Sequence, residues 1–142
     1  MSAFGKVVSA VTSKETNAGA RKIIVAEDEV LLRLTISEAL RAADFIVYDA
    51  VNADEVIELL STFPDVDAVV TDMYMQTPAD GMAVLSFVRA HHPHVLVVLA
   101  SAHTAEAAYF DAVFPKPFDG ARIVDWLKQE IRTRRTRRAD RT

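Results

Sequence analysis

The stretch KIIVAEDEV, residues 22–30, places three acidic residues directly after a short apolar run. A continuous apolar run rich in β-branched residues is typical of a strand that is buried on both faces of a parallel sheet. Glu27, Asp28 and Glu29 then follow with no turn residue before them. Because like charges at the end of a buried strand repel one another and are costly to desolvate, their concentration there calls for a chemical reason.

Four further apolar runs follow at regular intervals, and helical patterns separate them. The predicted strands are residues 22–26, 45–49, 67–71, 95–100 and 112–115. The predicted helices cover residues 30–43, a segment opened by the capping box of Asn52 and Glu55, residues 81–92, and a segment from 118 onward. This alternation predicts an α/β fold, a doubly wound five-stranded parallel sheet with helices on both faces.

Length and composition fit a single domain of 142 residues with 51% apolar residues and no cysteine. The lack of cysteine excludes thiolate catalysis and disulfides. No apolar run reaches the roughly 18 residues of a membrane span, and no secretory pattern opens the chain, so we expect a cytoplasmic protein with no membrane contact. We predict a flexible N-terminal extension over 1–20, a folded domain over 21–131 and a basic C-terminal tail over 132–142.

The net charge of −4 hides an asymmetry along the chain. Residues 131–142 contain six arginines and one aspartate and contribute +5, so the remainder carries −9. A basic tail is compatible with nucleic acid or an acidic partner. The run lacks interleaved aromatic residues, so a solvated helix end is the simpler interpretation and nucleic acid is not the expected partner.

Polar groups follow four of the five predicted strands. Ligands of parallel α/β sheets bind beyond the carboxyl ends of the strands, and these ends carry Glu27 and Asp28, Asp72, Ser101 and Lys116. Converging carboxylates favour a hard divalent cation such as Mg²⁺, and a lysine can hold a phosphate. The set suits phosphoryl transfer to a carboxylate nucleophile. No histidine ends a strand and neither GxSxG nor a P-loop is present, which argues against an acyl-transfer triad.

The order of these motifs resembles a known family. EDE after the first strand, D-x-x-M after the third, S-A after the fourth and K-P-F after the fifth are similar to a response-regulator receiver domain over about residues 21–131. The resemblance implies the flavodoxin-like strand order 2-1-3-4-5. It also implies a stand-alone response regulator of a two-component or phosphorelay system. Such a protein takes a phosphoryl group from a phosphohistidine with Mg²⁺, catalyses its own phosphorylation and dephosphorylation without an external substrate, and signals through protein contacts.

Carried over residue by residue, the resemblance implies the following site. Asp72 is the phosphoacceptor. The metal ligands are Asp28, Asp72, the backbone carbonyl of Tyr74 and, through water, Glu27. Lys116 and Ser101 contact the phosphoryl group, and the Lys116–Pro117 bond is cis. Tyr74 and His103 occupy positions that modulate the rate of dephosphorylation.

Two features depart from the usual receiver pattern. Lys116 follows Ser101 by only 15 positions, so we expect a shortened or irregular fourth helix. The position three before the lysine, often aromatic in the family, is Val113, with Phe114 next to it. The position therefore lacks the aromatic residue that usually pairs with the serine as a switch.

The resemblance implies a sensor histidine kinase or a histidine phosphotransfer protein as the phosphodonor, and a downstream protein partner. Two alternatives stay open. One is a DNA-binding regulator that uses the arginine-rich tail, and the other is a degenerate receiver that acts as a scaffold. A haloacid-dehalogenase-like phosphatase is disfavoured, because it would need an aspartate where Tyr74 stands.

Overall fold

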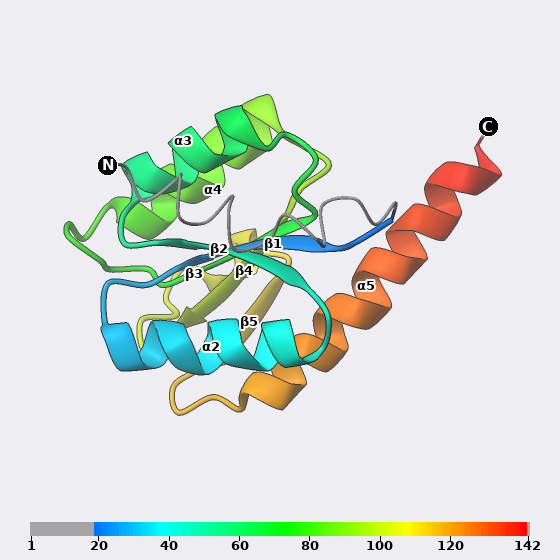
Figure 1. The fold of residues 1–142 in the computed structure, drawn as a ribbon. Coiled ribbons are helices and arrows are strands. Elements are labelled where there is room, and N and C mark those ends of the chain that lie inside the picture. The colour runs from blue at the N-terminus through cyan, green and yellow to red at the C-terminus, as the bar shows by residue number, and fades with distance from the viewer. Residues whose placement is uncertain (1–18, 142) are drawn as a thin grey trace.

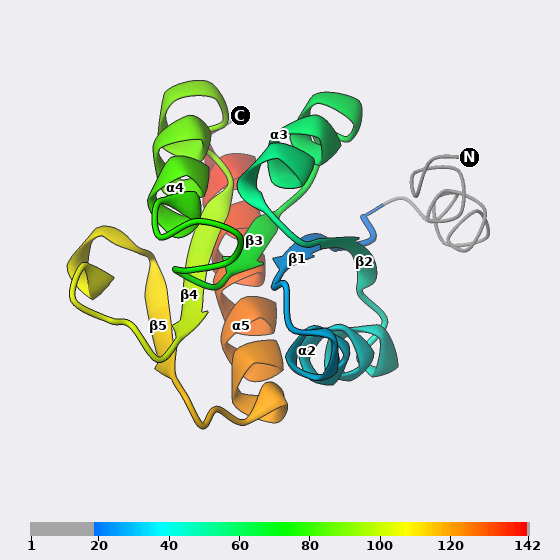
Figure 2. The ribbon, with the colours of Figure 1, turned by 90° about the vertical axis from the view of Figure 1, so that its left-hand side faces the viewer.

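The computed structural model describes residues 19–141 and shows five parallel strands between two layers of helices (Figures 1 and 2). The strands are β1 (Lys22–Ala26), β2 (Ile46–Ala50), β3 (Ala68–Thr71), β4 (Leu96–Ser101) and β5 (Ala112–Pro115). The helices are α2 (Val30–Ala42), α3 (Ala53–Thr62), α4 (Asp80–His91), the 3-10 turn η1 (Ala107–Tyr109) and α5 (Gly120–Asp140). Every predicted strand is confirmed, with bounds that differ by at most one residue.

The strand order is β2-β1-β3-β4-β5, as the receiver resemblance implies. Helices α3 and α4 cover one face of the sheet, and α2 and α5 cover the other (Figure 2). Because neighbouring residues of a strand point to opposite faces, β1 sends Ile24 toward α3 and α4 and sends Ile23 and Val25 toward α2 and α5. The near-continuous apolar strands of the sequence therefore serve two cores.

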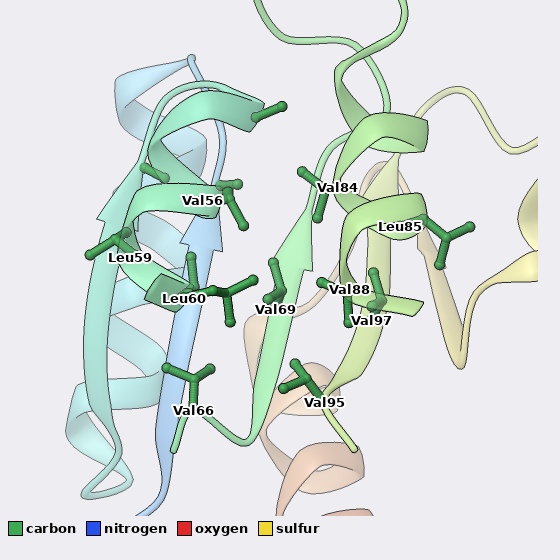
Figure 3. Packing of buried hydrophobic residues seen from close by; sticks show 14 of the residues in the cluster. Val56, Leu59, Leu60, Val66, Val69, Val84, Leu85, Val88, Val95 and Val97 are labelled. Atoms are coloured by element: carbon green, nitrogen blue, oxygen red, sulfur yellow. The ribbon is translucent and has the colours of Figure 1, made fainter. Parts of the chain in front are cut away.

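The core under α3 and α4 is built from aliphatic side chains of both helices and of the strands (Figure 3). Val56 and Leu60 of α3 and Val84 and Val88 of α4 are fully buried against Val69 of β3. The helix start predicted at Asn52 is confirmed, because its side chain accepts a hydrogen bond from the backbone N–H of Glu55 at 2.9 Å. The Glu55 side chain accepts from the N–H of Val51 at 2.9 Å, one residue before the N–H that a full capping box would use.

The connection between β4 and β5 contains only η1, which confirms the expectation of a shortened fourth helix. Phe110 is 93% buried there and fills the space beside the α3–α4 core. Val113 packs against that same core, whereas Phe114, one residue on, packs on the opposite face with α2 and α5. The only aromatic residue of β5 thus faces away from the connection that follows β4.

Helix α5 runs past residue 131, the point at which we placed the end of the domain, and continues to Asp140. Arg135 is not simply solvated, since it binds Asp67 and the carbonyl oxygens of Gly19 and Ala20. The predicted extension over 1–20 lies, except for those two residues, outside the described part of the chain. Within residues 19–141 no helix is both long and apolar enough to cross a membrane.

Candidate phosphoacceptor site

Three carboxylates meet at the carboxyl edge of the sheet. Glu27 and Asp28 follow β1, and Asp72 follows β3, its direct neighbour. Each of the three offers an oxygen atom within 4.8 Å of the other two. Glu27 is only 2% exposed and Asp72 6% exposed, whereas Asp28 lies on the surface. The backbone fixes this register, because the Asp72 N–H donates to the carbonyl of Ala26 at 3.1 Å.

Lys116 brings a positive charge to these carboxylates from the end of β5. Its Nζ lies 3.2 Å from Asp72 Oδ2 and 3.5 Å from Glu27 Oε1. Partial burial acts to lower the pKa of Lys116, but the charges of Asp72 and Glu27 outweigh it, and the pKa is raised above its usual value. The lysine therefore stays protonated and reaches both buried acids.

One lysine does not balance the acidic cluster. Burial, followed by the nearby charge of Asp72 and a hydrogen bond to Asp28, raises the pKa of Glu27 from 4.5 to about 7. The hydrogen bond that Glu27 accepts from the Glu29 N–H, at 3.1 Å, and the charge of Lys116 act in the opposite direction. A group of oxygen ligands with excess negative charge suits a hard divalent cation, so the residues present fit Mg²⁺.

Ser101 ends β4 and is fully buried. Its Oγ accepts a hydrogen bond from the N–H of His103 at 3.0 Å, and its carbonyl oxygen accepts one from the N–H of Lys116 at 3.3 Å. The first bond lies within the loop after β4, and the second joins the end of β4 to the residue after β5. The predicted cis bond between Lys116 and Pro117 is confirmed.

The two residues predicted to modulate dephosphorylation touch each other. The rings of Tyr74 and His103 stack with centroids 4.1 Å apart and an interplanar angle of 24°. Tyr74 follows Asp72 by two positions and is 45% exposed, so the stack joins the loop after β3 to the loop after β4 at the surface. This contact was not predictable from the sequence, because it links residues 29 positions apart.

Sequence reasoning also missed residues that support the site without belonging to the four strand-end motifs. Arg33 donates from Nη1 to the carbonyl of Glu27 at 2.8 Å and so fixes the backbone of the acidic pair. Asp80, 92% buried, accepts from the N–H of Thr77 at 2.7 Å and braces the loop after Asp72. The sequence signal for Asp80 was its position before Gly81 at a helix start, where an acidic side chain is favoured.

Gly81 allows the closest backbone approach in this region. A Cβ atom added there would lie 2.6 Å from the Cα of Met73 and 2.8 Å from the carbonyl oxygen of Asp72. The Gly81 N–H donates to the carbonyl of Met73 at 2.8 Å. The start of α4 is thus pressed directly against the backbone that presents Asp72, which only glycine permits without a shift.

Comparison with known proteins identifies the family to which this chain is similar. The family model of the response regulator receiver domain matches residues 23–128, which is more than half of the chain. A response regulator receiver protein from Sinorhizobium medicae has a crystal structure with a TM-score of 0.73 and 31% identity, covering 82% of this chain and 98% of that one. The receiver domain of NtrX from Brucella abortus, at 24% identity and a TM-score of 0.70, shares the fold over 78% of this chain and 98% of its own.

Curated relatives are longer proteins. The DNA-binding transcriptional regulator NtrC of Escherichia coli K12 is 34% identical over 115 residues, which are 75% of this chain and 24% of NtrC. The sensor kinase CckA of Brucella abortus is 29% identical over 123 residues, 80% of this chain and 13% of the kinase. The chain spans about a quarter or less of the length of these relatives. It belongs to the response-regulator receiver domain family and thus to two-component signalling.

Proposed function

We propose that Asp72 accepts a phosphoryl group from a phosphohistidine of a sensor histidine kinase or a histidine phosphotransfer protein. The observation that carries the proposal is the environment of Asp72, a buried carboxylate with Lys116 Nζ at 3.2 Å and two further carboxylates within 4.8 Å. A buried acid with a fixed cation and a candidate metal site is suited to act as a nucleophile toward a phosphoryl group.

In this reaction a carboxylate oxygen of Asp72 attacks the phosphorus atom, and the bond from phosphorus to the histidine nitrogen breaks. The electron pair of that bond leaves with the imidazole of the donor, and an aspartyl phosphate remains. Lys116 Nζ lies 3.2 Å from Asp72 Oδ2, where it can offset the negative charge of the transferring phosphoryl group. Its raised pKa keeps it protonated throughout the reaction. Ser101, at the end of β4, would hold the phosphoryl group from the other side.

The proposal includes Mg²⁺, held by Asp28, Asp72, the backbone carbonyl of Tyr74 and, through water, Glu27. A bound divalent cation neutralises charge on the transferring phosphoryl group. The support within this chain is a cluster of three carboxylates, one of which, Glu27, has a pKa raised to about 7 by burial and then by the charge of Asp72. The exposed Asp28 gives an incoming ion direct access from solvent.

Dephosphorylation needs water to reach the aspartyl phosphate. Tyr74 follows Asp72 by two positions, and its stack on His103 at the surface would limit that access. We therefore propose both residues as determinants of phosphate lifetime, with output through contacts to a protein partner. A cytoplasmic location remains part of the proposal.

The first experiment is intact mass spectrometry after incubation with acetyl phosphate, with and without Mg²⁺, on the wild type and on Asp72→Asn. We expect one added phosphoryl group of about 80 Da that requires both Mg²⁺ and Asp72. A wild type that gains no group, although it binds beryllofluoride, would indicate fast hydrolysis. Failure to bind beryllofluoride as well would overturn the proposal in favour of a degenerate scaffold.

Metal binding is tested separately by titration with Mg²⁺, followed by tryptophan fluorescence or calorimetry. Asp28→Ala should weaken Mg²⁺ by at least about tenfold, because it removes one of few carboxylate ligands. Glu29→Ala, one residue further on and exposed, is the matched control and should change the affinity little. Equal affinities in the wild type and Asp28→Ala would contradict the proposed ligand set.

A further inference from the structure

The end of α5 is a charged helix that extends past the body of the protein (Figure 1). Its last buried residue is Ile131, and none of residues 132–141 is buried. A helix that is polar on every side depends on ion pairs or on a partner. Among the described residues, its ion pairs beyond Ile131 involve Arg134, with Glu130 and Asp111, and Arg135, with Asp67.

Four arginines form one stripe along this helix end. Arg134, Arg137, Arg138 and Arg141 stand at positions i, i+3, i+4 and i+7, so they share a face over about 10 Å of helix. Like charges at these spacings repel one another. Within residues 19–141 no carboxylate lies at ion-pair distance from the last three. Arg137, Arg138 and Arg141 therefore present positive charge that no carboxylate of residues 19–141 offsets at close range.

The stripe lines a cavity of about 260 Å³ between α5 and the amino edge of the sheet. Leu96 and Ile131, both almost fully buried, give the cavity an apolar floor. The remaining lining residues are His94 and Asp67. Asp67 does not neutralise the stripe, because its carboxylate binds Arg135 at 3.0 Å and accepts a hydrogen bond from the Lys22 N–H at 2.9 Å.

The charges and shape of this cavity define a class of ligand. Arg134 and Asp67 of the lining are each paired with other residues, so Arg137, Arg138 and Arg141 leave the lining with three positive charges that have no carboxylate partner within residues 19–141. All six basic residues after 131 are arginines, whose planar guanidinium groups bind phosphate oxygens in pairs. An apolar floor below a row of arginines suits a small molecule with a ring at one end and several negative charges at the other.

We propose that this cavity binds a small molecule that carries two or more linked phosphate groups, as a nucleoside di- or triphosphate does. The phosphates would lie along Arg137, Arg138 and Arg141, and the ring on Leu96 and Ile131. Asp72 and Lys116 lie at the opposite edge of the sheet, so this binding is independent of the proposed phosphoacceptor function. A nucleic-acid duplex could reach the exposed arginines but has no free ring to place on Leu96 and Ile131, so it should compete poorly with ATP.

Calorimetric titration tests the proposal on the full chain with ATP, pyrophosphate, AMP and inorganic phosphate. The titrations are run without Mg²⁺ and at about 0.15 M salt, where weak surface attraction is screened. We expect one equivalent of ATP or pyrophosphate to bind, at least about tenfold more tightly than AMP or inorganic phosphate. No saturable binding of either oligophosphate would overturn the proposal.

The variant Arg137→Gln/Arg141→Gln should weaken ATP binding by at least about tenfold. The matched control is Arg122→Gln/Arg132→Gln, which removes the same charge from exposed positions of α5 outside the cavity, and it should change binding less than about twofold. Equal weakening by both variants would show non-specific attraction and overturn the proposal. So would saturable binding of a DNA duplex with no binding of ATP. Circular dichroism of each variant checks that the fold is retained.

Discussion

Like charges lie close together at both edges of the sheet, but they are negative and buried at one edge and positive and mostly exposed at the other. At the carboxyl edge Glu27 and Asp72 are buried, and Lys116 alone offsets them. At the amino edge the four arginines of the stripe are crowded at the end of a surface helix, and three of the four are exposed. Burial makes the first arrangement costly and dependent on pH, whereas exposure makes the second cheap and dependent on salt.

The edges also differ in how they are built. Four strands that are far apart in sequence deliver the acidic site, and their hydrogen-bonded register holds it. A single helix delivers the arginine stripe. Substitutions at the carboxyl edge should therefore change stability strongly, and substitutions along the stripe should leave the fold almost unaffected. Three predictions test this contrast.

The largest effect is expected from Glu27→Gln in the absence of Mg²⁺. The pKa of Glu27 is raised from 4.5 to about 7 in the folded protein. The folded state therefore holds a proton that the unfolded state loses, and the stability of the wild type falls as pH rises through that window. The variant has no such loss. Above pH 7 it should be more stable than the wild type by up to about 3 kcal/mol, with little difference below pH 4.5.

Urea unfolding at several pH values measures this difference. Glu29→Gln, an exposed neighbour, is the control and should follow the wild type. Mg²⁺ should stabilise the wild type more than the Glu27→Gln protein, because the ion relieves repulsion that the variant lacks. If the free energies of unfolding of wild type and variant change with pH in the same way across this range, Glu27 does not have a raised pKa in the folded protein.

The next largest effect is a loss of folding stability in Gly81→Ala. The added methyl group would lie 2.6 Å from the backbone of Met73, and no side-chain rotation can relieve that contact. We expect about 1–3 kcal/mol of destabilisation and a slower reaction of Asp72 with acetyl phosphate, since the backbone after Asp72 must move.

Gly120→Ala is the matched control for this steric argument. Its added methyl group would meet the Cβ of Ala39 at 3.1 Å, a contact that a small shift of α5 can relieve. Its stability should stay within about 1 kcal/mol of the wild type, because alanine also favours the helix. If both glycine variants lose the same stability, the close approach at Gly81 has no special cost.

The strands and the strand-end site were predictable because local sequence encodes them. The apolar run before Glu27 defines β1, and the parallel topology then brings the strand ends to one edge. Asn52 was a correct helix start because its capping bond spans only three residues. Features that depend on residues a few positions apart were therefore predicted correctly.

Contacts between distant loops and helices were not predictable. The stack of Tyr74 on His103 and the ion pair of Arg135 with Asp67 each join residues that only the folded topology brings together. The latter pair ties α5 to the sheet beyond residue 131. Phe114 shows the same limit in another way, since a shift of one residue along a strand moves a side chain to the other face.

The smallest effect is expected at the arginine stripe. Arg137→Gln/Arg141→Gln removes repulsion between like charges but also removes positive charge from the end of a helix, where the dipole favours it. These opposing effects should leave the free energy of unfolding within about 0.5 kcal/mol of the wild type at low salt, and the remaining difference should vanish near 0.5 M salt. Urea unfolding at two salt concentrations measures it. A loss above about 1 kcal/mol that persists at high salt would mean that these arginines are structurally paired, and the contrast between the two edges would then fail.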